Sequence, residues 1–284
     1  MRVRATASAV LLSVLAIIPA TAQTLPLRVV GSTTVNPVVV EAAEILRATQ
    51  KLAITVDTQG GSSGGITALA EGRADLAMSS RPLTPEDRQR FPRVRFQPIR
   101  LGTDALALAV SKDVWQSGVR ALTKAQIRAI YEGKITNWKE VGGKDQKIVF
   151  FDKEPGRGTW EVFAQWLYGD SKKAPLVGHL EVGSNEEGRT KVAGSKGAIT
   201  QLSLSWIDNK TIFPLAIRNE EGKDLVPSVA AAVDGSYPLA RPLLLISNGP
   251  TSASAKALIG LLLGPKGAEI LKKHGFAPVV IGAK

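Results

Sequence analysis

The 284-residue sequence contains no cysteine and only two histidines. Without cysteine the chain can form no disulfide framework, no thiolate nucleophile and no lipid-bearing cysteine at a cleavage site. The histidines, His179 and His274, are far apart in the sequence and show no metal-ligand spacing such as HxxxH. We therefore expect no metal centre, no thiol chemistry and no resident cofactor.

Sequence motifs of common enzymes are missing as well. No GxSxG elbow, Walker loop or GxGxxG run follows a predicted strand. Carboxylates are common, yet no pair of them stands out as catalytic. A binding protein therefore fits the sequence better than an enzyme, and an exported phosphatase or an anion sensor is the alternative.

Positive charge exceeds negative charge, with 36 Lys and Arg against 25 Asp and Glu and a formal net charge of +11. The basic residues are dispersed, aromatic residues do not alternate with them, and no zinc-finger or helix-turn-helix signature is present. An exported chain also rarely meets nucleic acid. We expect no nucleic-acid partner, and attraction of small anions is the simpler interpretation of the charge.

The first residues have the build of a secretory signal peptide. Arg2 and Arg4 are followed by an apolar run over 9–18 and by small residues at 20–22. That run is too short to span a bilayer comfortably, and no later apolar stretch approaches such a length. We expect cleavage after Ala22 and an exported, periplasmic protein that is soluble once residues 1–22 are removed.

Short β-loop-α alternations predict an α/β architecture with parallel strands and right-handed crossovers. The predicted strands are 27–30, 52–58, 74–78, 105–110, 147–151, 198–204, 211–217 and an extended segment at 238–247. The predicted helices are 35–48, 66–71, 124–131, 159–167, 252–263 and 267–274. The pattern restarts midway, which predicts two units with the second inserted into the first. The first unit covers 23–108 and 240–284, the second covers 109–239, and the chain crosses between them near 105–112 and 238–247.

Four turns rich in Gly, Ser, Thr or Arg follow predicted strands, and three of them lead directly into helices. They are GSTT at 31–34, GGSSGG at 60–65, MSSRPL at 78–83 and DKEPGRGTWEVF at 152–163. A helix N-terminus leaves N–H groups unpaired, glycine lets a ligand approach them, and hydroxyls add further donors. For each of the first three turns taken alone, the alternative is a helix cap or capped turn with no ligand. Together they predict an anion site, because the carboxyl ends of the strands in an open α/β sheet converge.

These turns supply the candidate ligand-binding residues. They are Ser32, Thr33, Thr34, Ser62, Ser63, Gly64, Ser79, Ser80, Arg81, Lys153, Gly156, Arg157, Gly158 and Thr159. Arg157 would add a full charge and a forked set of donors. The alternative is that Arg157 points to solvent or pairs with an acid such as Glu161. For Arg81 the alternative is an outward salt bridge.

The ordered set GSTT, GGSSGGI, ADLAMSSRPL, KEPGRGT and YPLARPL resembles the phosphate-binding proteins of bacterial ABC-type uptake systems, over about residues 27–276. The resemblance implies a two-lobed periplasmic-binding-protein fold of type II, with two hinge-crossing strands, that closes on a dehydrated oxyanion. It implies phosphate or a related tetrahedral oxyanion as ligand, a membrane permease of an ABC transporter as partner, and a monomer. It also implies a set of donors from three loops: Thr33, Thr34, Ser62, Ser63, Gly158 and Thr159.

Three positions depart from the best-known members of that family. This chain has Ser80 where they carry an aspartate, Lys153 where they carry an arginine, and Arg157 where they carry a serine. The aspartate can accept a hydrogen bond from a protonated phosphate, which sulfate cannot offer. A serine accepts without the charge that repels an unprotonated anion. The expectation is an oxyanion site that still binds phosphate but discriminates less strongly against sulfate.

Overall fold

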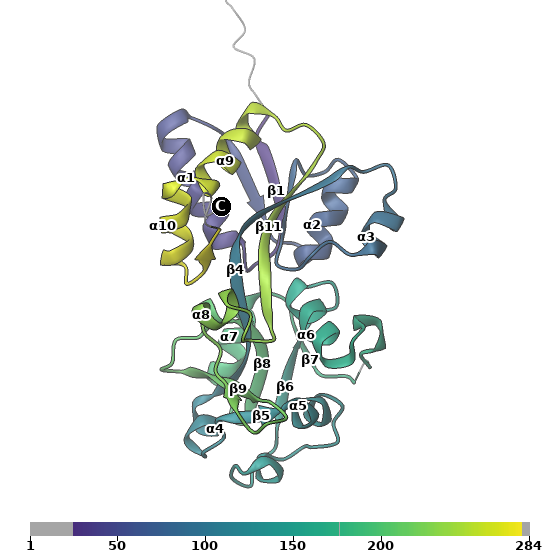
Figure 1. Cartoon of the computed structure of the whole chain (residues 1–284), viewed down its shortest axis with the longest axis vertical. Helices are drawn as coiled ribbons and strands as arrows, with labels where there is room; N and C mark the ends of the chain where they lie inside the picture. The colour runs from purple at the N-terminus through teal and green to yellow at the C-terminus, as the bar shows by residue number, and fades with distance from the viewer. Residues whose placement is uncertain (1–24, 176, 280–284) are drawn as a thin grey trace, which may run out of the picture.

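The chain forms two lobes connected by two long strands, β4 (Phe96–Ser111) and β11 (Ala240–Asn248), as Figure 1 shows. The structure, a computed structural model, describes residues 25–175 and 177–279, so the predicted signal peptide lies outside the described residues. Across these two ranges, every helix is too short or too polar to span a membrane.

The first lobe contains the elements nearest the two ends of the described chain. They are β1 (Leu27–Gly31), α1 (Asn36–Gln50), β2 (Ile54–Asp57), α2 (Gly61–Ala70), β3 (Leu76–Ser79), α3 (Pro85–Arg90), α9 (Ala253–Leu263), α10 (Pro265–Lys273) and β12 (Ala277–Pro278). The sheet runs in the order β2-β1-β3-β11-β4. Helices α1, α9 and α10 cover one face, and α2 and α3 lie on the other side.

Apolar residues at helical and strand spacing hold this lobe together. On α1, Val38, Val39, Ala42 and Leu46 are all buried, which is one face of a helix with 3.6 residues per turn. They pack in one core with Val29 of β1. Full burial of each larger apolar side chain contributes roughly 1.5–3 kcal/mol, so this face fixes α1 against the sheet.

The second lobe is formed by the middle of the chain. Its elements are α4 (Lys112–Gln116), β5 (Ala121–Thr123), α5 (Lys124–Tyr131), η1 (Trp138–Val141), β6 (Val149–Lys153), α6 (Gly158–Tyr168), η2 (Ser171–Lys173), β7 (Leu180–Val182), α7 (Asn185–Gly194), β8 (Ala198–Ser203), η3 (Leu204–Trp206), β9 (Ile212–Arg218), β10 (Asp224–Leu225) and α8 (Val229–Val233). The sheet continues from β4 in the order β8-β6-β7. β6 is parallel to both β7 and β8.

The two long strands pair with each other and carry the sheet from one lobe into the other. β4 and β11 are antiparallel, and Arg241 stands directly opposite Asp104 in the ladder. From Leu106 onward β4 pairs instead with β8, and from Leu108 also with β9. β4 is therefore part of both lobes, as a hinge strand must be.

The α/β class, the two lobes and the two crossing strands are confirmed. The expectation of parallel strands holds for β2-β1-β3 and β8-β6-β7 but is wrong at the hinge. There β11 is antiparallel to β3 and β4, because the chain leaves the first lobe along β4 and returns along β11. β4 also begins at Phe96, well before the predicted start at 105. Its first residues include the exposed Gln97, Pro98 and Arg100, which interrupt the apolar pattern that would have predicted a strand.

Two helices near the cleft differ from expectation. α2 begins at Gly61, inside GGSSGG, rather than at Ile66. α7 was not predicted, because its sequence NEEGRTKVAG has only a weak apolar pattern and buries just Asn185, Gly188 and Val192.

Candidate functional site

The N-termini of α1, α2, α6 and α7 contribute residues to one cavity between the lobes. α1 and α2 come from the first lobe, and α6 and α7 come from the second. The cavity is small, with room for about one water-sized group. The lining residues are Ser32, Thr33, Thr34, Gly61, Ser62, Ser80, Lys153, Arg157, Gly158, Thr159, Gly183 and Asn185.

Three of these helices lack a side-chain cap, as α4 and α10 elsewhere in the chain also do. The N-cap positions of α1, α2 and α6 are Val35, Gly60 and Arg157, and none accepts a hydrogen bond through its side chain. By contrast, α3, α5, α8 and α9 are all capped by a Ser or Thr hydroxyl. The first turns of α1 and α2 also hold no acid. No N-cap side chain therefore accepts from the positively polarised N–H groups at the start of these three helices.

Gly158 lets the two lobes approach closely at the cavity. A Cβ atom at this position would lie 2.4 Å from Ser62 Oγ and 2.8 Å from Ser80 Oγ, both in the first lobe. Ser62 Oγ in turn accepts a hydrogen bond from the Ser80 N–H at 3.1 Å. Only glycine allows the N-terminus of α6 to approach these hydroxyls.

Two cationic side chains line the cavity, and no carboxylate does. Lys153, at the end of β6, is only 1 % exposed, and its ammonium donates to the backbone oxygen of Ser184. Burial, and next the nearby positive charge of Arg157, lower the pKa of Lys153 to about 7. Arg157 bonds Glu154 through Nε and Nη2 at 2.9 and 2.7 Å. The protonation of Lys153 therefore responds to any further charge that enters the cavity.

Behind the cavity, a buried ion pair joins the two hinge strands. The Arg241 Nε atom donates to Asp104 Oδ2 at 2.8 Å, and both side chains are 1 % exposed. The remaining nitrogens of Arg241 donate to Thr159 Oγ1 at 2.9 Å and to Thr34 Oγ1 at 3.2 Å. Thr34 Oγ1 also accepts from Asn185 Nδ2 at 2.9 Å. With both lone pairs used, the Thr34 hydroxyl has only its proton left to offer.

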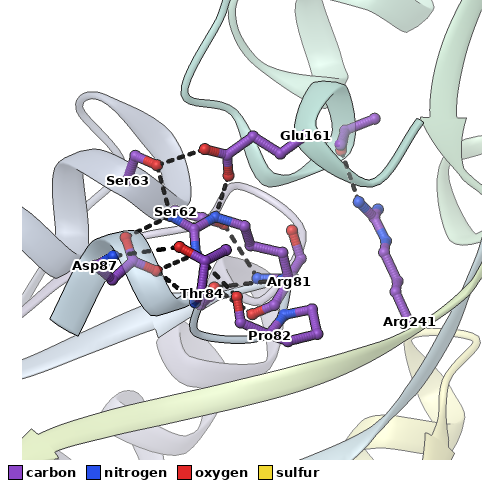
Figure 2. Close-up of polar contacts among 11 residues, drawn as sticks. Ser62, Ser63, Arg81, Pro82, Thr84, Asp87, Glu161 and Arg241 are labelled. Atoms are coloured by element: carbon purple, nitrogen blue, oxygen red, sulfur yellow. Dashed lines mark hydrogen bonds and ion pairs between the residues drawn. The ribbon is translucent and has the colours of Figure 1, made fainter. Parts of the chain in front are cut away.

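A second polar cluster lies at the rim of the cleft, and Figure 2 shows it beside Arg241. We call Ser63, Arg81, Asp87 and Glu161 the rim cluster. Arg81, from the first lobe, forms ion pairs with Asp87 and with Glu161 of α6. Ser63 Oγ lies between them, accepting from Arg81 Nη2 and donating to Glu161 Oε1, both at 2.8 Å. The rim cluster therefore bridges the two lobes.

The structure brings most of the predicted residues to the cavity. Those that line it are Ser32, Thr33, Thr34, Ser62, Ser80, Lys153, Arg157, Gly158 and Thr159. Those that do not are Ser63, Gly64, Ser79, Arg81 and Gly156.

Each of the five residues outside the cavity makes its contacts elsewhere. Ser63 and Arg81 are in the rim cluster, and Arg81 is 4 % exposed, so its ion pairs do not point outward. Ser79 Oγ donates to the Arg81 carbonyl. Gly64 lies within α2, and the Gly156 carbonyl accepts from the Ser63 N–H at 3.1 Å.

The alternative for Arg157, an ion pair with an acid, is present, but the acid is Glu154 and not the expected Glu161. Arg157 pairs with Glu154, whereas Glu161 pairs with Arg81. The helical spacing from 157 to 161 suggested a pairing of Arg157 with Glu161, but Glu161 points across the cleft to Arg81 of the first lobe.

Sequence reasoning missed Gly61, Gly183 and Asn185 in the cavity and Arg241 behind it. Two signals were present. The run SNEE at 184–187 has a capping residue and an acid three positions later, and Ser184 does cap α7. Arg241 lies in the quoted motif YPLARPL. Among the residues that the structure describes, no group of three His, Asp or Glu side chains is placed to hold a metal ion.

The chain is similar to several proteins of known sequence or structure. The chain is 27% identical over 257 residues to the phosphate-binding protein PstS of Bacillus subtilis (strain 168), covering 89% of this chain and 80% of that one. It is similar to the solved structure of a putative phosphate ABC transporter substrate-binding protein with bound phosphate from Clostridium perfringens (TM-score 0.79, 28% identity, 90% of this chain and 100% of that chain).

An ABC-type phosphate transport receptor from Vibrio cholerae is also similar (TM-score 0.69, 28% identity, 89% of this chain and 100% of that chain). The family model described as a PBP superfamily domain matches residues 18–266. The chain therefore belongs to the PBP superfamily.

Proposed function

We propose that this protein captures phosphate, or a related tetrahedral oxyanion, between its lobes and delivers it to the membrane permease of an ABC transporter. The observation that carries the proposal is the convergence of three uncapped helix N-termini on a small cavity lined by two cations and no carboxylate. The names of the similar proteins support phosphate as the ligand and ABC transport as the destination.

Hydroxyls and backbone N–H groups provide most of the donors in this site. Oriented neutral donors in a water-excluded cavity stabilise an anion strongly, because they are already in place when it arrives. Lys153 and Arg157 supplement them with full charge. The cleft can therefore hold a dehydrated oxyanion without a metal ion as counter-charge.

Binding is favoured over catalysis by the chemistry of Lys153. With a pKa of about 7, the free amine of Lys153 could act as a general base near neutral pH. A bound anion beside it, however, stabilises the ammonium form and raises the pKa again. Lys153 then holds the anion instead of removing a proton, so we propose a carrier and not a phosphatase.

Delivery requires the cleft to open, and several contacts between the lobes oppose opening. The Ser63 N–H donates to the Gly156 carbonyl at 3.1 Å, and Arg157 donates to the Thr58 carbonyl at 3.2 Å. The rim cluster adds an ion pair across the same gap. We propose that these contacts set the balance between closed and open forms, with the lobe boundaries near 108 and 240.

The place of action follows from the same proposal. A carrier that serves an ABC uptake system meets its permease at the outer face of the inner membrane. The basic, apolar and small-residue pattern of 1–22 supports export to the periplasm.

Phosphate binding is the first test. Titration calorimetry of the wild-type protein with inorganic phosphate should show one site. Thr159→Val removes a donor from the cavity and should weaken binding by about one to two decades, the value of a hydrogen bond to a charged group. Thr55→Val, a matched change on β2 outside the cavity, should have no effect. The absence of binding in the wild type, or equal affinity in Thr159→Val, contradicts the proposal.

The pH dependence of affinity should follow Lys153. Below about pH 7 the free protein carries the ammonium, whereas above it the anion binds only with uptake of a proton, so affinity falls as pH rises. Arginine stays charged throughout. The affinity of Lys153→Arg relative to wild type should therefore increase as pH rises above 7, and phosphate's own titration cancels in the ratio. A ratio that does not change with pH would show that Lys153 does not titrate on binding.

The rim cluster should favour the closed form. Glu161→Gln removes the charge that Arg81 meets across the cleft. The ratio of open to closed protein should therefore rise about tenfold, which corresponds to the free energy of a hydrogen bond to a charged group. Glu86→Gln is the matched control, since its 3.0 Å pair with Lys172 has side chains 54% and 68% exposed and should contribute little.

Solution X-ray scattering of anion-free protein provides the measurement. A larger radius of gyration for Glu161→Gln, with Glu86→Gln equal to wild type, is the expected result. Equal radii for all three proteins would mean that the rim cluster does not control closure.

A further inference from the structure

Asn185 places an unpaired hydrogen-bond acceptor at the cavity. Its side chain is 1 % exposed and comes from the first residue of α7, in the second lobe. Asn185 lines the cavity, and its Oδ1 atom is buried without a hydrogen-bond partner. A buried amide oxygen left unpaired is costly, so such an atom calls for a donor that binds there.

The contacts of Thr34 set the orientation of the Asn185 amide. Asn185 Nδ2 donates to Thr34 Oγ1, which also accepts from Arg241. In this orientation the Thr34 proton is available to a ligand and Oδ1 of Asn185 has no protein partner. The opposite orientation would let Oδ1 accept the Thr34 proton, and the site would lose a donor to the anion.

No other side chain that lines the cavity must accept a hydrogen bond. Lys153 and Arg157 only donate, and the Ser and Thr hydroxyls can turn to donate. The lining holds no carboxylate. Ser80, which replaces an aspartate of the best-known relatives, is therefore free to donate, whereas Asn185 Oδ1 is not.

We propose that Asn185 is a specificity-determining residue that recognises the proton of hydrogen phosphate. Its Oδ1 accepts the P–OH proton, and a fully ionised tetrahedral anion such as sulfate would place an oxygen against this acceptor instead. The amide carries no charge, so it selects by hydrogen bonding without repelling the anion. The proposal rests on the proposed function, since it names which protonation state that site prefers.

The test compares phosphate with sulfate by calorimetry near pH 8, where phosphate is mainly the monoprotonated dianion. Asn185→Leu removes the acceptor and should lower phosphate affinity about ten- to a hundredfold relative to any change for sulfate. Asn185→Asp keeps the acceptor and adds a charge, which suits a helix N-terminus. It should widen the preference for phosphate by lowering sulfate affinity further.

Two control variants separate this role from a general loss of donors. Thr159→Val removes a donor to either anion and leaves the Thr34 hydroxyl that orients Asn185 in place, so it should weaken both equally. Ser80→Ala should leave the phosphate-to-sulfate ratio unchanged. Thermal melting of each variant checks that it is folded.

Three outcomes overturn the proposal. Equal losses for the two anions in Asn185→Leu would show that the amide donates, and an altered ratio in Ser80→Ala would place the acceptor at residue 80. A wild type that prefers sulfate would contradict it directly. If the wild type binds neither anion, the proposed function itself fails.

Discussion

The site depends on one buried ion pair, Arg241 with Asp104, which joins the two strands that connect the lobes. Burial of two charges is tolerated because each is fully satisfied: Asp104 also accepts from Ser203, and Arg241 donates to Thr34 and Thr159. An isolated buried charge would cost several kcal/mol. Asp104 thus fixes the guanidinium on the hinge, and the guanidinium fixes one hydroxyl from each lobe as a donor toward the cavity. The same arginine therefore joins the two hinge strands and orients the hydroxyls of the site.

This arrangement explains how a chain with little reactive chemistry can recognise an anion selectively. Helix N-termini without side-chain caps provide partial positive charge from both lobes, and Lys153 and Arg157 add full charge where the lobes meet. Because donors come from both lobes, the complete set exists only when the cleft is closed. The rim cluster favours that state from outside the cavity, through contacts that do not involve the ligand. Asn185, also from the second lobe, adds the acceptor that tests the ligand's protonation. Specificity thus rests on a residue other than those that supply charge and those that hold the cleft closed.

The sequence predicted the fold class and most of the cavity because both depend on local patterns. Strand, glycine-rich turn and helix follow one another along the chain, so Thr34, Ser62 and Thr159 could be placed at one edge of the sheet from spacing alone. Local spacing could not predict which side chains point into the cavity and which pair with residues of the other lobe. Arg81 carries the charge expected of a ligand contact, yet it forms ion pairs with Asp87 in the next helix and with the distant Glu161. Asn185 escaped notice because its helix has a weak apolar pattern, and Arg241 because its partners are 82 to 207 residues away in the chain.

The central claim is that the hinge ion pair orients donors for the anion. The most direct measurement is the phosphate affinity of the double variant Asp104→Leu with Arg241→Met, which removes both charges and leaves no unpaired one in the core. Replacing a whole buried pair by apolar residues is often neutral for stability, so the variant should melt near the wild-type temperature. Its Thr34 and Thr159 hydroxyls would lose the guanidinium that orients them. Phosphate should then bind about one to two decades more weakly, as expected for loss of charged hydrogen bonds. A folded double variant that binds phosphate as tightly as the wild type would contradict the account.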